Sequence, residues 1–128
     1  MHHHIKWLLL AGLLSSSSPA TAFDLLLAGE WISDDRKTVV EMSACPSNER
    51  ATCATILADQ PEAGEPSLAG KMVGVDFVQR SDGTWEGAVL AASGARLPAT
   101  LSMPHPERLD MKVCAAVVFC DSVSYLRR

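Results

Sequence analysis

Short apolar runs separated by turn residues constrain the fold of this chain more than any other feature. Along 72–79, apolar residues alternate with small or polar ones, and Ser81-Asp82-Gly83 then gives a strong turn signal. About eight such segments follow one another between Gly29 and Arg127, and only residues 25–28 favour a helical turn. The pattern therefore predicts an all-β domain.

A sheet of this kind is expected to close on itself, because closure removes the unpaired strand edges that promote aggregation. We predict a small antiparallel up-and-down barrel of about eight strands, lipocalin-like. The interior of such a barrel either is filled by side chains, which is the interpretation that we favour for a chain this short, or holds one small ligand. The alternation places Val73, Val75 and Phe77 on one face. The inward residues that form the candidate ligand-binding set are Trp31, Phe77, Trp85, Met111 and Tyr125, with Met42 and Leu101 beside them.

The N-terminus has the composition of a secretory signal peptide. Lys6 precedes an apolar run over 7–14, and Ala20-Thr21-Ala22 fits the small-x-small cleavage pattern. The run is far shorter than the roughly 20 residues that span a bilayer. We expect a signal peptide over 1–22, cleavage near Ala22, and a single barrel domain over 23–128. The mature chain is then periplasmic or secreted and has no transmembrane segment.

Charge and residue types argue against several classes of function. The chain carries 15 acidic and 11 basic residues, whereas nucleic acids and anionic lipids attract clustered Lys and Arg. His105 is the one histidine after residue 22, and it lies between two prolines, so a catalytic triad is not expected. Asp34-Asp35 fits a solvated turn better than a metal site. We expect no enzymatic activity, no cofactor, no metal and no nucleic-acid partner.

The four cysteines fit structural disulfides better than a metal or redox centre. Their spacings are C-x7-C and C-x5-C, whereas zinc sites place paired cysteines about two to four residues apart and redox sites use C-x-x-C. Sequence alone allows three pairings. We favour Cys45–Cys53 and Cys114–Cys120, because each pair flanks an apparent turn between strands whose spacing suits a disulfide. Two disulfides would also indicate export.

The segment inside the second cysteine pair is the most unusual part of the chain. Residues 115–119, Ala-Ala-Val-Val-Phe, contain no polar side chain, although hairpin tips are normally polar. In one interpretation, which we favour, the tip is buried at a barrel end. In the other, Val117, Val118 and Phe119 present an apolar surface to a partner.

Gly29-Glu30-Trp31 resembles the G-x-W opening of calycin-type barrels such as lipocalins. In those folds the Trp closes one barrel end near an Arg from the last strand, and Arg127 is placed to play that part. The fuller pattern resembles the bacterial exported family catalogued as domain of unknown function 2147, over nearly all of 23–128. The other motifs that carry this resemblance are Val39-Val40-Glu41 before Cys45, Cys53, Gly70-Lys71-Met72, Thr84-Trp85-Glu86-Gly87, Ser93-Gly94, Leu109-Asp110-Met111-Lys112-Val113-Cys114, and Cys120 ahead of Tyr125-Leu126-Arg127.

Two departures from that family's pattern bear on function. Leu90-Ala91-Ala92 stands where the family usually has a Tyr-Asp-Pro turn, so a binding role of that turn would be missing here. Tyr125-Leu126-Arg127 stands where the family usually ends Trp-x-Arg. The resemblance implies a periplasmic calycin-like barrel and brings no established activity.

The function that we expect is binding without catalysis. The chain would be a periplasmic protein that holds an unknown ligand, a small apolar molecule or an envelope component. The alternative is a periplasmic protein–protein module, such as an inhibitor of a protease or lysozyme. Small exported barrels with a G-x-W start and a loop closed by a disulfide resemble such inhibitors. The expected partner is therefore an apolar ligand or an envelope protein.

Overall fold

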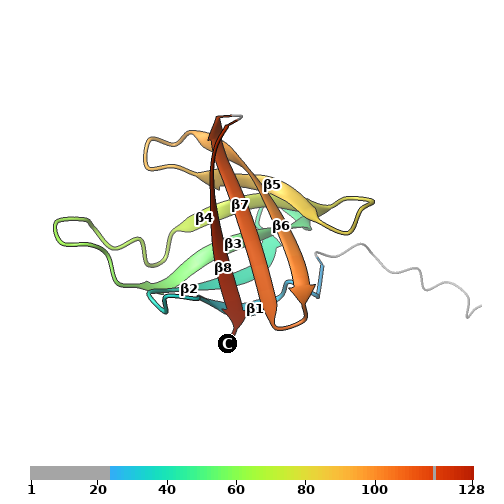
Figure 1. The fold of residues 1–128 in the computed structure, drawn as a ribbon, viewed down its shortest axis with the longest axis horizontal. Coiled ribbons are helices and arrows are strands. Elements are labelled where there is room, and N and C mark those ends of the chain that lie inside the picture. The colour runs from blue at the N-terminus through green and yellow to red at the C-terminus, as the bar shows by residue number, and fades with distance from the viewer. Residues whose placement is uncertain (1–23, 117) are drawn as a thin grey trace, which may run out of the picture.

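Eight antiparallel strands close into one barrel in the computed structural model, which describes residues 24–116 and 118–128 (Figure 1). Each strand pairs with the next along the chain, and β8 pairs with β1. The predicted up-and-down barrel is thus confirmed. The strands are β1 (Gly29–Ser33), β2 (Thr38–Cys45), β3 (Asn48–Asp59), β4 (Met72–Gln79), β5 (Trp85–Leu90), β6 (Arg96–His105), β7 (Arg108–Ala116) and β8 (Phe119–Arg127).

The signal peptide expected over 1–22 lies outside the described residues. Of residues 25–28, where a helical turn was expected, 25–27 form a turn and none is helical. Within the described residues, no helix has the length and hydrophobicity that crossing a bilayer would take.

Because the strands alternate in direction, their connections fall at two opposite ends of the barrel. The connections at 34–37, 60–71 and 91–95 and the β7–β8 connection form what we call the loop end. Figure 1 shows the β3–β4 and β5–β6 loops extending to the left, and the β7–β8 hairpin projecting at the top. The turn at 24–27 precedes β1 at the opposite end, here called the closed end, with the connections at 46–47, 80–84 and 106–107.

The main core fills the closed end. Leu27, from the N-terminal turn, is completely buried, as are Trp31, Leu101 and Leu109 from three different strands. Burial of such large apolar side chains contributes roughly 1.5–3 kcal/mol each. The turn before β1 therefore contributes to the core through Leu27.

A bulge in β4 reverses one expected strand face. Asp76 has a positive φ of 59°, and the β4–β5 register shifts between Val75 and Val78. The extra residue turns Phe77 into the main core while Val75 joins a second, smaller cluster with the Cys45–Cys53 disulfide. The expectation that Val75 and Phe77 share a face was therefore wrong, because simple alternation does not anticipate a bulge.

Gly87 is the partner that this bulge requires. A side-chain carbon placed at Gly87 would lie 2.6 Å from the Val75 carbonyl oxygen and 2.8 Å from the Phe77 ring. Real contacts of this kind are not that short, so only glycine lets β5 approach β4 here. The Phe77 ring consequently packs directly against the backbone at Gly87, which fixes the position of the ring.

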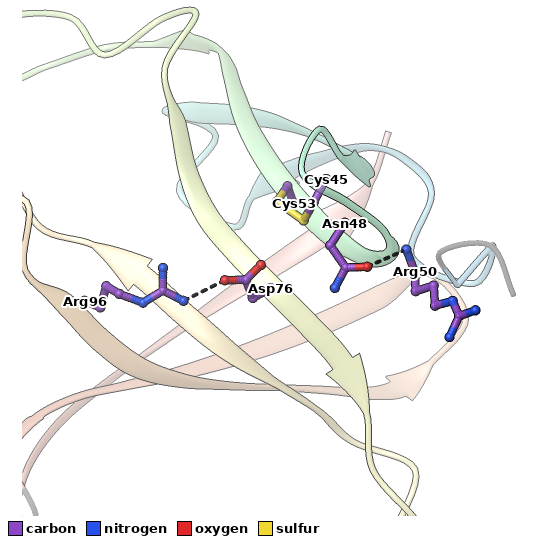
Figure 2. Close-up of a disulfide and its surroundings, with 6 residues drawn as sticks. All are labelled: Cys45, Asn48, Arg50, Cys53, Asp76 and Arg96. Carbon is purple, nitrogen blue, oxygen red and sulfur yellow. Dashed lines mark hydrogen bonds and ion pairs between the residues drawn. A yellow bond between two sulfur atoms is a disulfide. The ribbon is translucent and has the colours of Figure 1, made fainter.

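Both hairpin disulfides favoured from the sequence are present in the structure. Cys45–Cys53 joins β2 to β3 with a Cα–Cα distance of 4.9 Å, and Cys114–Cys120 joins β7 to β8 at 4.0 Å. Figure 2 shows the first disulfide with the Asn48 Oδ1 atom accepting from the Arg50 amide and with the Asp76–Arg96 ion pair, which joins β4 to β6. Two disulfides are compatible with an oxidising extracellular compartment.

Candidate functional site

A cavity of about 290 Å³ lies inside the barrel towards the loop end. It is bounded by the start of β2, the end of β5 and the loop at 60–71, whereas the closed end is filled by the main core. The barrel interior is thus neither wholly filled nor wholly hollow. The lining residues are Thr38, Val40, Met42, Ala54, Ile56, Leu68, Val73, Gly74, Phe77, Val89, Leu90, Met111 and Tyr125.

The structure divides the candidate ligand-binding set between the two ends. Phe77, Met111 and Tyr125 line the cavity together with Met42. Trp31 and Trp85 do not line it, and neither does Leu101. Neither tryptophan is therefore placed to touch a molecule in the cavity.

Hydrogen bonds to the N-terminal turn explain where the two tryptophans lie. The Trp31 indole Nε1 donates to the Leu27 carbonyl at 2.9 Å, and the Trp85 indole Nε1 donates to Asp24 Oδ2 at 3.0 Å. A buried indole N–H needs such a partner, and the turn supplies one for each ring. These two hydrogen bonds hold both indole rings in the closed end.

Leu68 and Thr38 belong to the cavity wall although the sequence analysis did not select them. Leu68 follows a segment rich in Pro, Gly and acidic residues that is typical of a solvated loop, and its contact with the cavity depends on how that loop folds back. Thr38 begins a strand after a polar turn, so the sequence did not indicate that its side chain faces an apolar cavity. Only the folded loop end brings them together.

Asp59 anchors the loop that carries Leu68. Its Oδ2 accepts from the Leu68 amide at 2.8 Å, and its Oδ1 accepts from the Ser67 hydroxyl. These two hydrogen bonds lower the pKa of the Asp59 carboxyl. At neutral pH the carboxylate therefore holds Leu68 over the cavity.

Among the residues that the structure describes, Tyr125 is the one ionisable residue in the lining of the cavity. Burial raises the pKa of its phenol, and the negative charges of Asp35 and Asp34 raise it further. The phenol is therefore neutral at physiological pH and can donate a hydrogen bond. Since Tyr125 is the one tyrosine of the chain, its titration can be followed without interference.

The apolar tip of the β7–β8 hairpin is exposed. Val118 is 78% exposed and Phe119 is 71% exposed, and Ala115 and Ala116 are exposed as well. Val117 lies outside the described residues. The favoured expectation that this tip is buried at a barrel end was wrong, because the β7–β8 hairpin extends past its pairing with β6 and β1 (Figure 1).

His105 is exposed at the end of β6, and its Nδ1 accepts from the Glu107 amide at 3.0 Å in the turn that follows. No group of three or more His, Cys, Asp or Glu side chains among residues 24–116 and 118–128 could hold a metal ion. The cavity is thus the best-formed candidate site.

Comparison with protein-family models, curated proteins and solved structures finds no match for this chain. The resemblance to domain of unknown function 2147 consequently stays a prediction that rests on the motifs described above. The barrel and its cavity are therefore the observations that bear on function.

Proposed function

We propose that this chain is an exported, non-enzymatic binding protein that holds a small apolar molecule in the cavity at the loop end. The observation that carries the proposal is the cavity of about 290 Å³, whose lining is apolar apart from Thr38 and Tyr125. Ligand sites are typically concave, mostly apolar and furnished with a few polar groups. The lining includes no carboxylate, imidazole or thiol, which favours binding over catalysis.

The size of the cavity limits its occupant. An engineered apolar cavity of about 150 Å³ binds benzene, so about 290 Å³ suits a molecule of roughly two fused rings or a medium-length chain. Burying such a molecule removes apolar surface from water on both sides of the contact. This gain is the driving force that we propose for binding.

An uncharged fluorescent probe, N-phenyl-1-naphthylamine, tests this function directly. Its fluorescence should rise when the purified protein is added, and Val89→Phe, which fills part of the cavity, should weaken the affinity at least about tenfold. Val78→Phe is the matched control, because Val78 is 51% exposed and does not line the cavity. Absence of binding of both this probe and naphthalene itself by the folded wild-type protein would overturn the proposal.

A second candidate function, inhibition of an envelope protease or lysozyme, is favoured by the exposed hairpin tip. Exposed apolar side chains that stand together are a common mark of interaction sites. Val118 and Phe119 project from the loop end and are held by the Cys114–Cys120 disulfide, as a docking loop would be.

Enzyme inhibition assays separate this candidate from ligand binding. The protein is added to lysozyme and to a trypsin-like protease, and the residual activity of each is measured. If the tip docks, Phe119→Asp should abolish inhibition, whereas Leu25→Asp, at an exposed leucine of the closed end, should not. Probe binding in the cavity should be unchanged in both variants.

A further inference from the structure

The two hydroxyl groups of the cavity lie on the same wall. Ser33, at the end of β1, pairs with Tyr125 of β8 in the ladder, and its Oγ accepts from the Thr38 amide at 3.0 Å. Thr38 and Tyr125 thus flank Ser33 on adjacent strands and both line the cavity. The remaining lining is apolar, so the cavity has one polar wall.

Neither hydroxyl group has a hydrogen-bond partner within residues 24–116 and 118–128. The Ser33 hydroxyl is already engaged, since it donates to Asp35 Oδ1 at 2.6 Å while it accepts from the Thr38 amide. Polar groups next to an apolar space gain free energy when a partner reaches them. A ligand with a hydrogen-bonding group at this wall would supply that partner.

The charges around this wall disfavour an anionic ligand. Asp34 and Asp35 follow Ser33 directly, and their negative charges help to raise the pKa of the Tyr125 phenol. The lining contains no Lys, Arg or His that could pair with a carboxylate. An anionic ligand would therefore give up its hydration close to the negative charges of Asp34 and Asp35.

A cationic ligand is disfavoured for a different reason. The Asp35 carboxylate accepts from the Ser33 hydroxyl and from the Lys37 amide at 3.0 Å, and neither aspartate lines the cavity. The charges of Asp34 and Asp35 attract an ammonium group, but inside the cavity that group would give up its hydration without a contacting carboxylate, and this loss outweighs the attraction. What remains is an uncharged molecule.

We propose that the cavity selects an uncharged apolar molecule bearing a hydroxyl or a similar hydrogen-bonding group, which the Tyr125 hydroxyl binds with Thr38 beside it. This inference rests on the proposed function and adds the chemical class of the ligand. It assigns Tyr125 as the residue that determines specificity. Fatty acids and other apolar carboxylates are excluded from the cavity, although their chains would fit its apolar lining.

Four compounds with the same ring system and different polar groups test this selection. Naphthalene, 2-naphthol, 2-naphthoate and 2-naphthylmethylammonium are each used at pH 7 to displace N-phenyl-1-naphthylamine from the wild-type protein. We expect 2-naphthol to bind about three- to tenfold more tightly than naphthalene, which is the effect of one neutral hydrogen bond. The carboxylate and the ammonium compound should bind at least about tenfold more weakly than 2-naphthol.

Tyr125→Phe identifies the group that makes the selection. The variant removes only the hydroxyl, which has no partner in the described structure, so folding should be retained. Its affinity for naphthalene should stay within about twofold of wild type, while the preference for 2-naphthol should disappear. Retention of the full preference by Tyr125→Phe would overturn the role of Tyr125.

The outcomes separate this inference from the function on which it rests. If the fluorescent probe binds but naphthoate displaces it as well as naphthol does, selection for an uncharged ligand is wrong and apolar binding stands. The same holds if the ammonium compound matches naphthol. If neither the probe nor any of the four compounds binds, both proposals fail together.

Discussion

The guanidinium carbon of Arg127 lies 4.2 Å from the centre of the Trp31 ring. The same group donates hydrogen bonds to the carbonyls of Ala28 at 3.1 Å, Leu26 at 2.9 Å and Pro106 at 3.2 Å. One side chain of the last strand thus joins the first strand, the N-terminal turn and the β6–β7 connection. This arrangement matches the Trp–Arg contact that the G-x-W motif led us to expect.

Replacing Arg127 should therefore destabilise the barrel where it closes. We expect Arg127→Met to lower the free energy of unfolding by about 2–3 kcal/mol, because three carbonyls lose a charged donor and the ring loses its cation. Urea unfolding followed by tryptophan fluorescence measures the change. Arg128→Met, at an exposed residue with one long hydrogen bond of 3.3 Å to Glu30, should change stability by less than about 0.5 kcal/mol.

Thr52 is buried with a hydroxyl that has no hydrogen-bond partner in the described structure. Valine has nearly the same shape and carries no polar group to desolvate, so Thr52→Val should raise the free energy of unfolding by about 1–2 kcal/mol. Thr55→Val, at a less buried position of the same strand, should have the smaller effect. A loss of stability in Thr52→Val would show that the hydroxyl is satisfied in solution.

Gly87→Ala should be more damaging than its small change in size suggests. The added carbon would lie 2.6 Å from the Val75 oxygen and 2.8 Å from the Phe77 ring, so β4 and β5 must separate. We expect a loss of about 2–3 kcal/mol and weaker binding of the fluorescent probe, since Phe77 lines the cavity. Gly94→Ala, which has a positive φ of 90° and open space around it, should cost only about 1–2 kcal/mol and leave binding unchanged.

The phenol of Tyr125 should titrate above its ordinary pKa of 10.0. Because burial and the charges of Asp35 and Asp34 favour the neutral form, the contribution of Tyr125 to stability is complete below pH 10 and is lost as the pH rises through the raised pKa. Absorbance at 295 nm reports this tyrosine alone, and the midpoint should return to about 10 in guanidinium chloride. A native midpoint at or below 10 would contradict the burial of the ring.

The barrel could be predicted from the sequence because each strand carries its own evidence. Alternation and turn residues are local features. The eight strands and the two disulfide-linked hairpins can therefore be predicted from short segments of the sequence. The face of Val75 could not be predicted in this way, because the bulge at Asp76 depends on the approach of Gly87 from the next strand. Local patterns do not contain that contact.

The candidate site was predictable only in part. Phe77, Met111 and Tyr125 face inward by alternation, and so do Trp31 and Trp85. Which inward residues touch empty space depends on how much of the barrel the turn at 24–27 fills, and on how Asp59 folds the loop at 60–71. Both depend on contacts between residues far apart in the sequence.

A barrel that is filled at one end and hollow at the other can change its ligand without losing its fold. Val73, Val89 and Met111 are partly buried residues of the cavity wall, so substituting them removes less core packing than substituting the fully buried Leu27 and Trp31 of the closed end. Selection can therefore act on these three wall positions with little effect on the closed end. This barrel is in consequence a good scaffold for redesign, in which new specificities are sought at Val73, Val89 and Met111 while the closed end is kept constant.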